Sequence, residues 1–183
     1  MTYDELVDEI LPDAPGCPRM TVRDRVRDGA RQFARESLVW DVEAERRTAD
    51  SGETEFDLIL PREGQFWTVT AVEIDEKPVA HEWDREERIV RLPRGRRGEL
   101  VIRVALEPKD GQASLPQALA EWSEAIKDYA RYRLMVMPGQ EWTQPEMGMA
   151  YRRQYDDRVN DARIRKARSH STQPLRTAPQ PFI

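Results

Sequence analysis

The apolar residues of the first 37 positions recur every three or four residues, which is the period of an amphipathic helix. The first set is Leu6, Val7, Ile10 and Leu11, and the second is Val22, Val26, Ala30 and Phe33. Thr2 and Glu5 have the spacing of a capping box, and Thr21 occupies the capping position of the second set. We therefore expect two helices, separated by the proline-rich segment 12–18.

Between residues 38 and 110 the apolar period changes to two, as in strands that bury one face. The first alternating run is Leu38, Trp40, Val42 and Ala44, and the last is Leu100, Ile102, Val104 and Leu106. Shorter runs lie between them, at 56–60, 66–74, 79–83 and 88–92. Six short strands with turns between them predict a small antiparallel sandwich or barrel.

The helical period returns after Gly111. One stripe contains Leu115, Leu119, Trp122, Ile126 and Tyr129, and a second contains Met147, Tyr151, Tyr155, Val159 and Ala162. Ser114 and Thr143 each precede a stripe with the spacing of a capping box, and Pro138-Gly139 separates the two stripes. These patterns predict one helix that runs to about residue 137 and another that ends near residue 168.

This order of elements predicts an α+β fold in which helices from both chain ends form one bundle. The N-terminal helices occupy 1–37, the antiparallel β insert 38–110, and the C-terminal helices 111–168. Residues 169–183 contain three prolines and mostly polar side chains, which predicts an extended arm. Phe182 and Ile183 close this arm, so we expect its tip to fill an apolar groove on another subunit.

The amino-acid composition limits the kinds of functional site that we expect in this chain. The chain of 183 residues holds one cysteine and two histidines, too few for an internal disulfide or for the usual zinc sites. It contains no Gly-rich nucleotide-binding loop, no apolar run of bilayer length and no secretory signal at its start. We therefore expect a soluble protein of the cytoplasm that uses no metal and no other cofactor and binds no membrane.

The charge is distributed unevenly along the chain. The formal net charge is −5, yet residues 151–183 carry eight Arg or Lys and only three Asp. The remaining residues carry 21 basic and 31 acidic groups. This asymmetry predicts that the basic C-terminal region meets an acidic partner, either nucleic acid or another protein.

Several side chains allow both a functional and a structural interpretation. Cys17 is either a nucleophile or a small loop residue, and His81 is either a general base or a polar residue on a sheet surface. Structural roles are more typical of both residues in these contexts. Four tryptophans could stack on bases, although a core or a subunit interface is their commoner place: Trp67, Trp83, Trp122 and Trp142.

Two charged clusters are also open to two interpretations. The acidic residues Glu82, Asp84, Glu86 and Glu87 either hold a divalent ion or form a solvated hairpin tip, and they lack the spacing of a calcium loop. The turn Arg94-Gly-Arg-Arg-Gly98 either contacts phosphates or is simply solvated.

Two segments resemble the head–tail connector, or adaptor, proteins of tailed bacteriophages. They are the start MTYDELVDEILPDAPGCPRMTVRDRVRDGARQFARES and the end RLMVMPGQEWTQPEMGMAYRRQYDDRVNDARIRKARS, followed by PLRTAPQPFI. The resemblance is most specific from residue 143 to residue 168 and in the closing residues. The chain departs from minimal connectors by its long β insert.

The resemblance implies a structural virion protein without enzymatic activity, found in the neck of the particle and in the host cytoplasm during assembly. It implies a homo-oligomeric ring, commonly of twelve copies, that lies under the portal and lines the DNA channel. The implied partners are the portal protein, tail or nozzle proteins, neighbouring copies, and genomic DNA that passes through the lumen without sequence-specific binding.

The residues expected to contact partners lie in the basic helix and the arm. They are Arg163, Arg165, Lys166, Arg168, Leu175, Arg176, Phe182 and Ile183. The main alternative is a nucleic-acid-binding module that uses the basic helix 151–168 with Tyr151 and Tyr155. A hydrolase that uses two carboxylates is a further alternative, although the sequence selects no pair.

Overall fold

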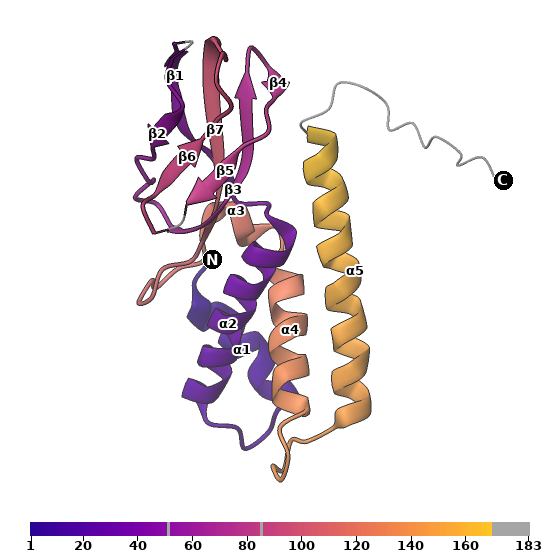
Figure 1. The fold of residues 1–183 in the computed structure, drawn as a ribbon. Coiled ribbons are helices and arrows are strands. Elements are labelled where there is room, and N and C mark those ends of the chain that lie inside the picture. The colour runs from indigo at the N-terminus through magenta and orange to yellow at the C-terminus, as the bar shows by residue number, and fades with distance from the viewer. Residues whose placement is uncertain (51, 85, 170–183) are drawn as a thin grey trace, which may run out of the picture.

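The computed structural model describes residues 1–50, 52–84 and 86–169, and its first helices follow the predicted pattern closely (Figure 1). Helix α1 spans Tyr3–Ile10. Its capping box is confirmed, because the Glu5 N–H donates to the Thr2 hydroxyl (3.2 Å) and the Thr2 N–H donates to the Glu5 carboxylate (2.7 Å). The α-helix ends before Pro12, which lies within the short 3-10 turn η1 (Leu11–Asp13).

Helix α2 spans Arg19–Ser37 and begins before the expected cap. The prediction for Thr21 is wrong, because Thr21 lies in the first turn and Pro18 is the N-cap. Proline is suited to helix starts because its fixed φ and missing N–H cost nothing there. The helix ends at Leu38, whose left-handed φ of 55° redirects the chain, so the first strand starts later than the alternation suggested.

The middle of the chain forms two antiparallel sheets, so the α+β class is confirmed. The larger sheet has the order β1-β7-β3-β4, with β1 at Asp41–Ala49, β3 at Gln65–Ile74, β4 at Lys77–Pro78 and β7 at Gly98–Glu107. The smaller sheet has the order β2-β6-β5, with β2 at Glu55–Asp57, β5 at Glu82–Asp84 and β6 at Ile89–Arg91.

Aromatic and aliphatic side chains join the two sheets. The rings of Phe66 on β3 and Trp83 on β5 lie 5.1 Å apart between centroids. Phe56 and Val90 of the smaller sheet belong to the same buried cluster as Ile102 of the larger one. The pairing of β3 with β7 is irregular, with register shifts between Phe66 and Thr68 and between Val69 and Ala71.

The C-terminal part of the chain forms helices α3 (Gln117–Ala120), α4 (Ser123–Met135) and α5 (Pro145–Ser169). The predicted continuous helix to residue 137 is interrupted, because Trp122 takes a non-helical conformation as the N-cap of α4. Ser114 does not cap a helix but forms an isolated antiparallel bridge with Thr2. The Thr143 hydroxyl donates to the Met137 carbonyl and accepts from the Gln140 N–H (3.1 Å), so it holds the preceding loop.

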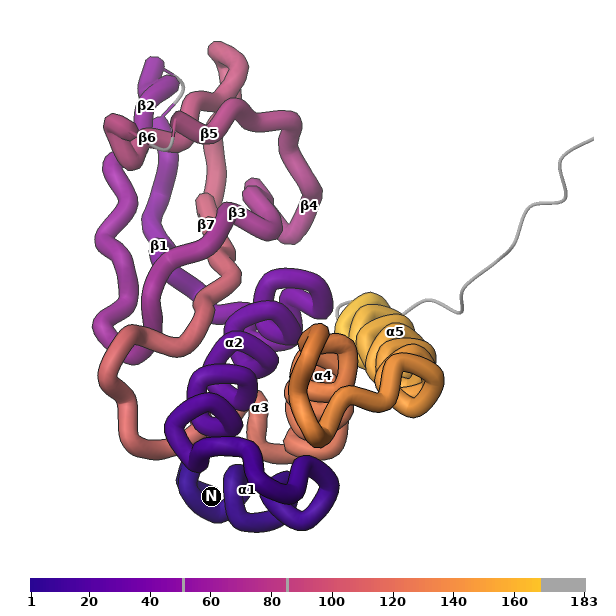
Figure 2. Tube along the Cα trace, turned by 90° about the horizontal axis from the view of Figure 1, so that it is seen from below, coloured from indigo at the N-terminus to yellow at the C-terminus, as the bar shows by residue number. Residues whose placement is uncertain are grey.

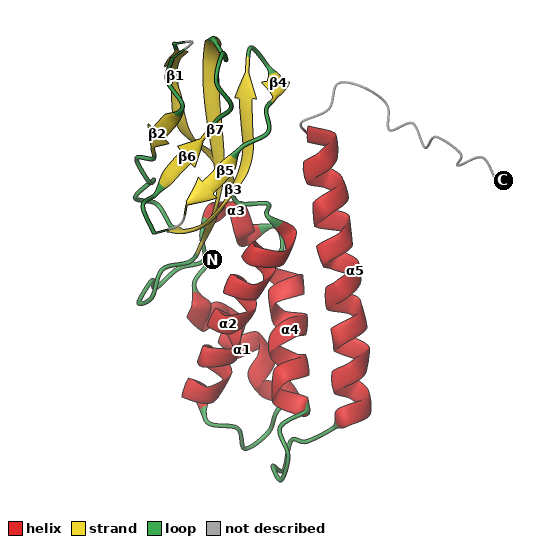
Figure 3. Cartoon of the chain, viewed as in Figure 1, coloured by secondary structure: helices red, strands yellow, loops and turns green. Residues whose placement is uncertain are grey.

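Helices from both ends of the chain pack against one another. Helix α4 contacts α1, α2 and α5, and Figure 2 shows α5 on the side of α4 that faces away from α1. Phe33 of α2 lies 5.5 Å from Trp122 between ring centroids, and Tyr129 of α4 lies 5.1 Å from Tyr155 of α5. These buried rings make the helices one body, with the sheets at one end of it (Figure 3).

An ion pair with a buried carboxylate joins the helices to the larger sheet. The Arg35 guanidinium on α2 donates to the carboxylate of Glu107 at the end of β7, and that carboxylate is buried. Within the described parts of the chain, no helix is both long and apolar enough to cross a lipid bilayer.

Candidate partner-binding site

Helix α5 carries four of the eight predicted partner-binding residues in its last turns: Arg163, Arg165, Lys166 and Arg168. Its inner face is fixed by Tyr155, Val159 and Ala162, which are buried against the rest of the helical body. The Tyr155 hydroxyl donates to the Glu36 carboxylate of α2 at 2.9 Å. Beyond Ala162 no residue of α5 up to position 168 is buried, so polar contacts hold the end of the helix.

Arg163 and Arg165 both bind the protein's own body. The Arg163 Nε donates to the backbone carbonyl of Glu36 at 2.7 Å. The Arg165 guanidinium forms an ion pair with Glu121 (2.5 Å between Nη1 and Oε2) and lies 4.6 Å from the centroid of the Trp122 ring. Both side chains remain largely exposed, so they can exchange these contacts for others with little loss of burial.

Lys166 lies over a buried carboxylate on the larger sheet. Its Nζ is 3.5 Å from Asp41 Oδ1, and the Asp41 side chain is only 5% exposed. Arg103 on β7 donates to the same carboxylate at 2.8 Å, and the Thr70 hydroxyl also donates to it. This Asp41 cluster, made of Asp41, Thr70, Arg103 and Lys166, attaches the end of α5 to the sheet.

The electrostatics of the Asp41 cluster follow from its burial. Burial by itself would raise the pKa of Asp41, but the hydrogen bonds from Thr70 and Arg103, together with the charge of Lys166, hold that pKa below its usual value. Burial lowers the pKa of Lys166, because Asp41 offsets only part of the desolvation and Arg103 adds repulsion. Asp41 is therefore the anion that balances the charges of both Arg103 and Lys166.

A surface cavity of about 340 Å³ lies between the end of α5, the larger sheet and the α3–α4 corner. Its lining includes Asp41, Arg103, Trp122, Arg165 and Lys166. These residues place charges of both signs at the cavity, and the Arg165 guanidinium covers the Trp122 ring. Such a surface is suited to ion pairing with a partner segment.

The remaining predicted partner residues have different positions. Arg168 is exposed and makes no hydrogen bond or ion pair within the described residues. Leu175, Arg176, Phe182 and Ile183 lie outside the described residues. The sequence placed Arg163, Arg165, Lys166 and Arg168 on one helix, and their role in partner binding stays a prediction. It missed Asp41 and Glu121, which come from distant segments and share no spacing with the helix.

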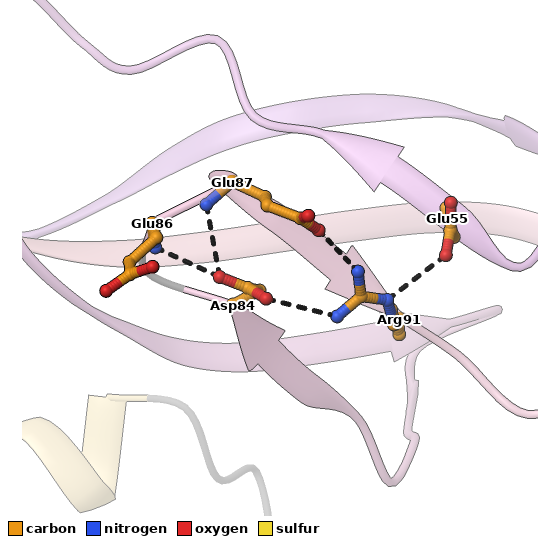
Figure 4. Close-up of polar contacts among 5 residues, drawn as sticks. All are labelled: Glu55, Asp84, Glu86, Glu87 and Arg91. Carbon is orange, nitrogen blue, oxygen red and sulfur yellow. Dashed lines mark hydrogen bonds and ion pairs between the residues drawn. The ribbon is translucent and has the colours of Figure 1, made fainter.

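The acidic residues of the β5–β6 hairpin surround an arginine instead of an open ion site (Figure 4). The Asp84 carboxylate accepts the backbone N–H groups of Glu86 and Glu87 at 3.0 and 3.1 Å, and the bond from Glu87 is the largest cause that lowers its pKa. Arg91 donates to Asp84 (3.3 Å), Glu87 (2.5 Å) and Glu55 (3.1 Å). The guanidinium of Arg91 is thus the cation of this cluster.

Arg91 was missed because its partners depend on strand register. Glu55 and Glu82 are both opposite Arg91 in the smaller sheet, and only the paired strands reveal this. Across the described residues, no group of three or more His, Cys, Asp or Glu side chains is arranged to hold a metal ion.

Cys17 and His81 occupy structural positions. Cys17 is buried beside the start of α2, and burial raises the pKa of its thiol. His81 is exposed, and its Nδ1 lies 3.2 Å from the Val79 carbonyl two residues earlier. Cys17 lies between the 3-10 turn η1 and helix α2, whereas His81 lies between strands β4 and β5, so the two residues belong to different parts of the fold.

The tryptophans also pack within the chain. Trp122 and Trp142 are buried, Trp83 contacts Phe66, and the Arg35 guanidinium lies 4.5 Å from the centroid of the Trp67 ring. The preference for core positions over base stacking is therefore confirmed for Trp122 and Trp142.

Comparison with known proteins gives no further guide to the site. No family model matches the chain, and no curated protein matches it. The resemblance to head–tail connectors stays a prediction from the quoted segments.

Proposed function

We propose that the chain is a structural protein of a phage neck, a head–tail connector that forms a ring under the portal, joins capsid to tail and has no catalytic role. The observation that carries the proposal is the packing of α1 and α2 with α4 and α5 into one helical body, with the strands inserted between them in sequence. This is the layout that the resemblance implies. In the assembled particle the protein resides in the neck of the virion.

The finer architecture belongs to the same proposal. The helices act as a bundle that contacts neighbouring copies, and the β insert projects from the bundle as a small sandwich or barrel. Residues 169–183 act as an arm that docks into the portal, and tail or nozzle proteins bind the opposite side of the ring. The net charge of −5 favours passage of DNA through the ring, because acidic walls repel phosphates.

The outer side of α5 supports contact with a neighbouring copy. Arg153, Asp157, Asp161 and Arg168 are exposed there and carry charges of both signs. In a closed ring each copy meets two neighbours through two different surfaces, and charges of both signs fix the register of such contacts.

The contacts of α5 refine the role of its basic residues. Arg163, Arg165 and Lys166 hold the last turns on Glu36, Glu121 and Asp41, so in this proposal they position the arm. Arg168 and the arm then contact the portal directly. The same contacts reduce the number of free cations on 151–168 and so disfavour the alternative in which this helix binds nucleic acid.

The arm is tested by truncation. A chain that lacks residues 169–183 should keep the melting temperature of the full chain, because its core residues lie before position 163, and should no longer bind the portal ring. A full-length chain with F182S and I183S tests the apolar tip of the arm by itself, and it should bind the portal ring weakly. Equal portal binding by the full and truncated chains would show that the arm is not the docking segment.

A further inference from the structure

The turn between β6 and β7, residues 94–98, carries an unneutralised basic surface. Arg94, Arg96 and Arg97 are exposed, and none of them makes a hydrogen bond or an ion pair within the described residues. Nearby arginines behave differently. Arg46 binds both Glu43 and Glu99, and the contacts between Arg46 and these carboxylates are 2.7–2.9 Å.

Two of the carboxylates beside this turn accept hydrogen bonds from the chain itself. The Asp75 side chain lies against Gly98 and accepts the Glu99 N–H at 2.9 Å, and the Glu99 carboxylate accepts from Arg46 at 2.9 Å. The adjacent charges of Glu76 and Lys77 are both exposed and offset each other. The carboxylates of Asp50 and Asp75 keep their charges beside the turn, yet the three exposed guanidiniums outnumber them and leave a local excess of positive charge.

The position of the turn leaves it accessible. Gly98 pairs with Ala49 and Leu100 pairs with Ile74, so the turn lies at the same end of the larger sheet as the β3–β4 turn. Figure 1 shows this end pointing away from α2 and α4. A side chain on Gly95 would meet no atom within 4 Å, so a ligand can approach the backbone closely.

The chemistry of this surface selects its partner. We propose that residues 94–98 form a contact site for the phosphate backbone of duplex DNA, through Arg94, Arg96 and Arg97. Guanidinium groups bind phosphate oxygens through paired N–H donors, and such contacts need no particular base sequence. The centre of a protein–protein interface is usually apolar. Among the described residues, the exposed large apolar side chains lie elsewhere: Met1, Met20, Ile59, Met147, Met149 and Ile164.

This site is distinct from the basic helix. On α5, Arg152 and Arg158 are paired with Asp156 and Asp128, and Lys166 is paired with Asp41. The turn has fewer arginines than the helix but none of them is paired. The proposal is independent of ring formation.

The test compares two triple variants of the full chain that change the net charge equally. One removes the turn cations (R94Q, R96Q and R97Q), and the other removes exposed α5 cations (R153Q, R163Q and R168Q). The probe is a fluorescent 30-base-pair duplex of random sequence, titrated by anisotropy between about 20 and 200 mM salt. Three phosphate contacts lower the affinity about 500-fold over a tenfold rise in salt. Circular dichroism melts verify that each variant is folded.

In the turn variant, the plot of log affinity against log salt should become less steep, with a slope smaller in magnitude by about 2.7. The α5 variant should keep the slope of the original chain. Loss of binding in the α5 variant alone, equal loss in both variants, or no binding by the original chain at 20 mM salt would each overturn the proposal. Retention of an acidic protein by the turn, with no DNA binding, would also overturn it. The assay contains no portal, so its failure leaves the connector proposal untouched.

Discussion

Replacing Asp41 by Asn tests whether a single buried carboxylate holds the end of α5 to the sheet. The substitution leaves Arg103 and Lys166, which are 26% and 18% exposed, without their common anion. Removing one partner of a fully buried pair costs about 3–5 kcal/mol, and partial solvation of the two cations reduces this to about 2–3 kcal/mol. For a chain of this size the melting temperature should fall by about 5–10 °C.

Lys166→Met is the matched control for the same cluster. It keeps the Asp41–Arg103 contact and removes a cation whose pKa is lowered by burial, so the free energy of unfolding should change by less than about 1 kcal/mol. Urea unfolding at pH 7 measures both variants. A loss below about 0.5 kcal/mol for Asp41→Asn, or a larger loss for Lys166→Met, would refute the reasoning.

The pH dependence of the Asp41 variant has a defined sign. The folded-state pKa of Asp41 is lower than its unfolded value, so its ionised form stabilises the fold above about pH 4. This stabilisation is lost as the pH falls through the folded-state pKa. The difference in unfolding free energy between the original chain and Asp41→Asn should therefore be constant from pH 5 to 7 and shrink below about pH 4.

Three further predictions concern the helical body. Gly29→Ala should lower the free energy of unfolding in urea by about 1–3 kcal/mol, because the added Cβ would lie 2.9 Å from the Ile126 carbonyl oxygen. Alanine has the better helix propensity, so an increase in stability would contradict this close packing. Tyr155→Phe should cost about 1–2 kcal/mol in the same assay, because Glu36 loses a buried donor, and an unchanged midpoint would show that water replaces it. The thiol of Cys17 should react with a disulfide reagent about tenfold more slowly in the native chain than in urea, and equal rates would indicate an open loop.

The sequence pattern predicts elements well where one physical effect dominates. The capping box at Thr2 and the apolar stripe of α2 follow from local hydrogen bonding and period alone, and both are present. The start of β1 was misplaced because Leu38 adopts a left-handed conformation, which the alternating apolar pattern does not reveal. Trp122 likewise interrupts a helical stripe because the ring packs on Phe33 of a distant helix.

At the candidate site, too, the sequence predicts some features and not others. The basic residues of α5 could be selected from charge distribution along the chain, since their spacing is local. Their partners Asp41 and Glu121 could not be selected, because ion pairs between elements depend on how the helix and the sheet meet. The cluster around Arg91 depends on strand register in the same way. The acidic partner of each arginine, once known, distinguishes the arginines that stabilise the fold from those that are free to bind another molecule.

The central claim is tested most directly by native mass spectrometry of the purified chain mixed with the portal ring encoded in the same genome. The connector account predicts that the portal ring gains about a dozen copies of the chain, the number that the resemblance implies for a closed ring. Electron microscopy of the same sample should then show an added ring on one side of the portal. A portal mass that stays unchanged at concentrations where the chain is folded would contradict the account.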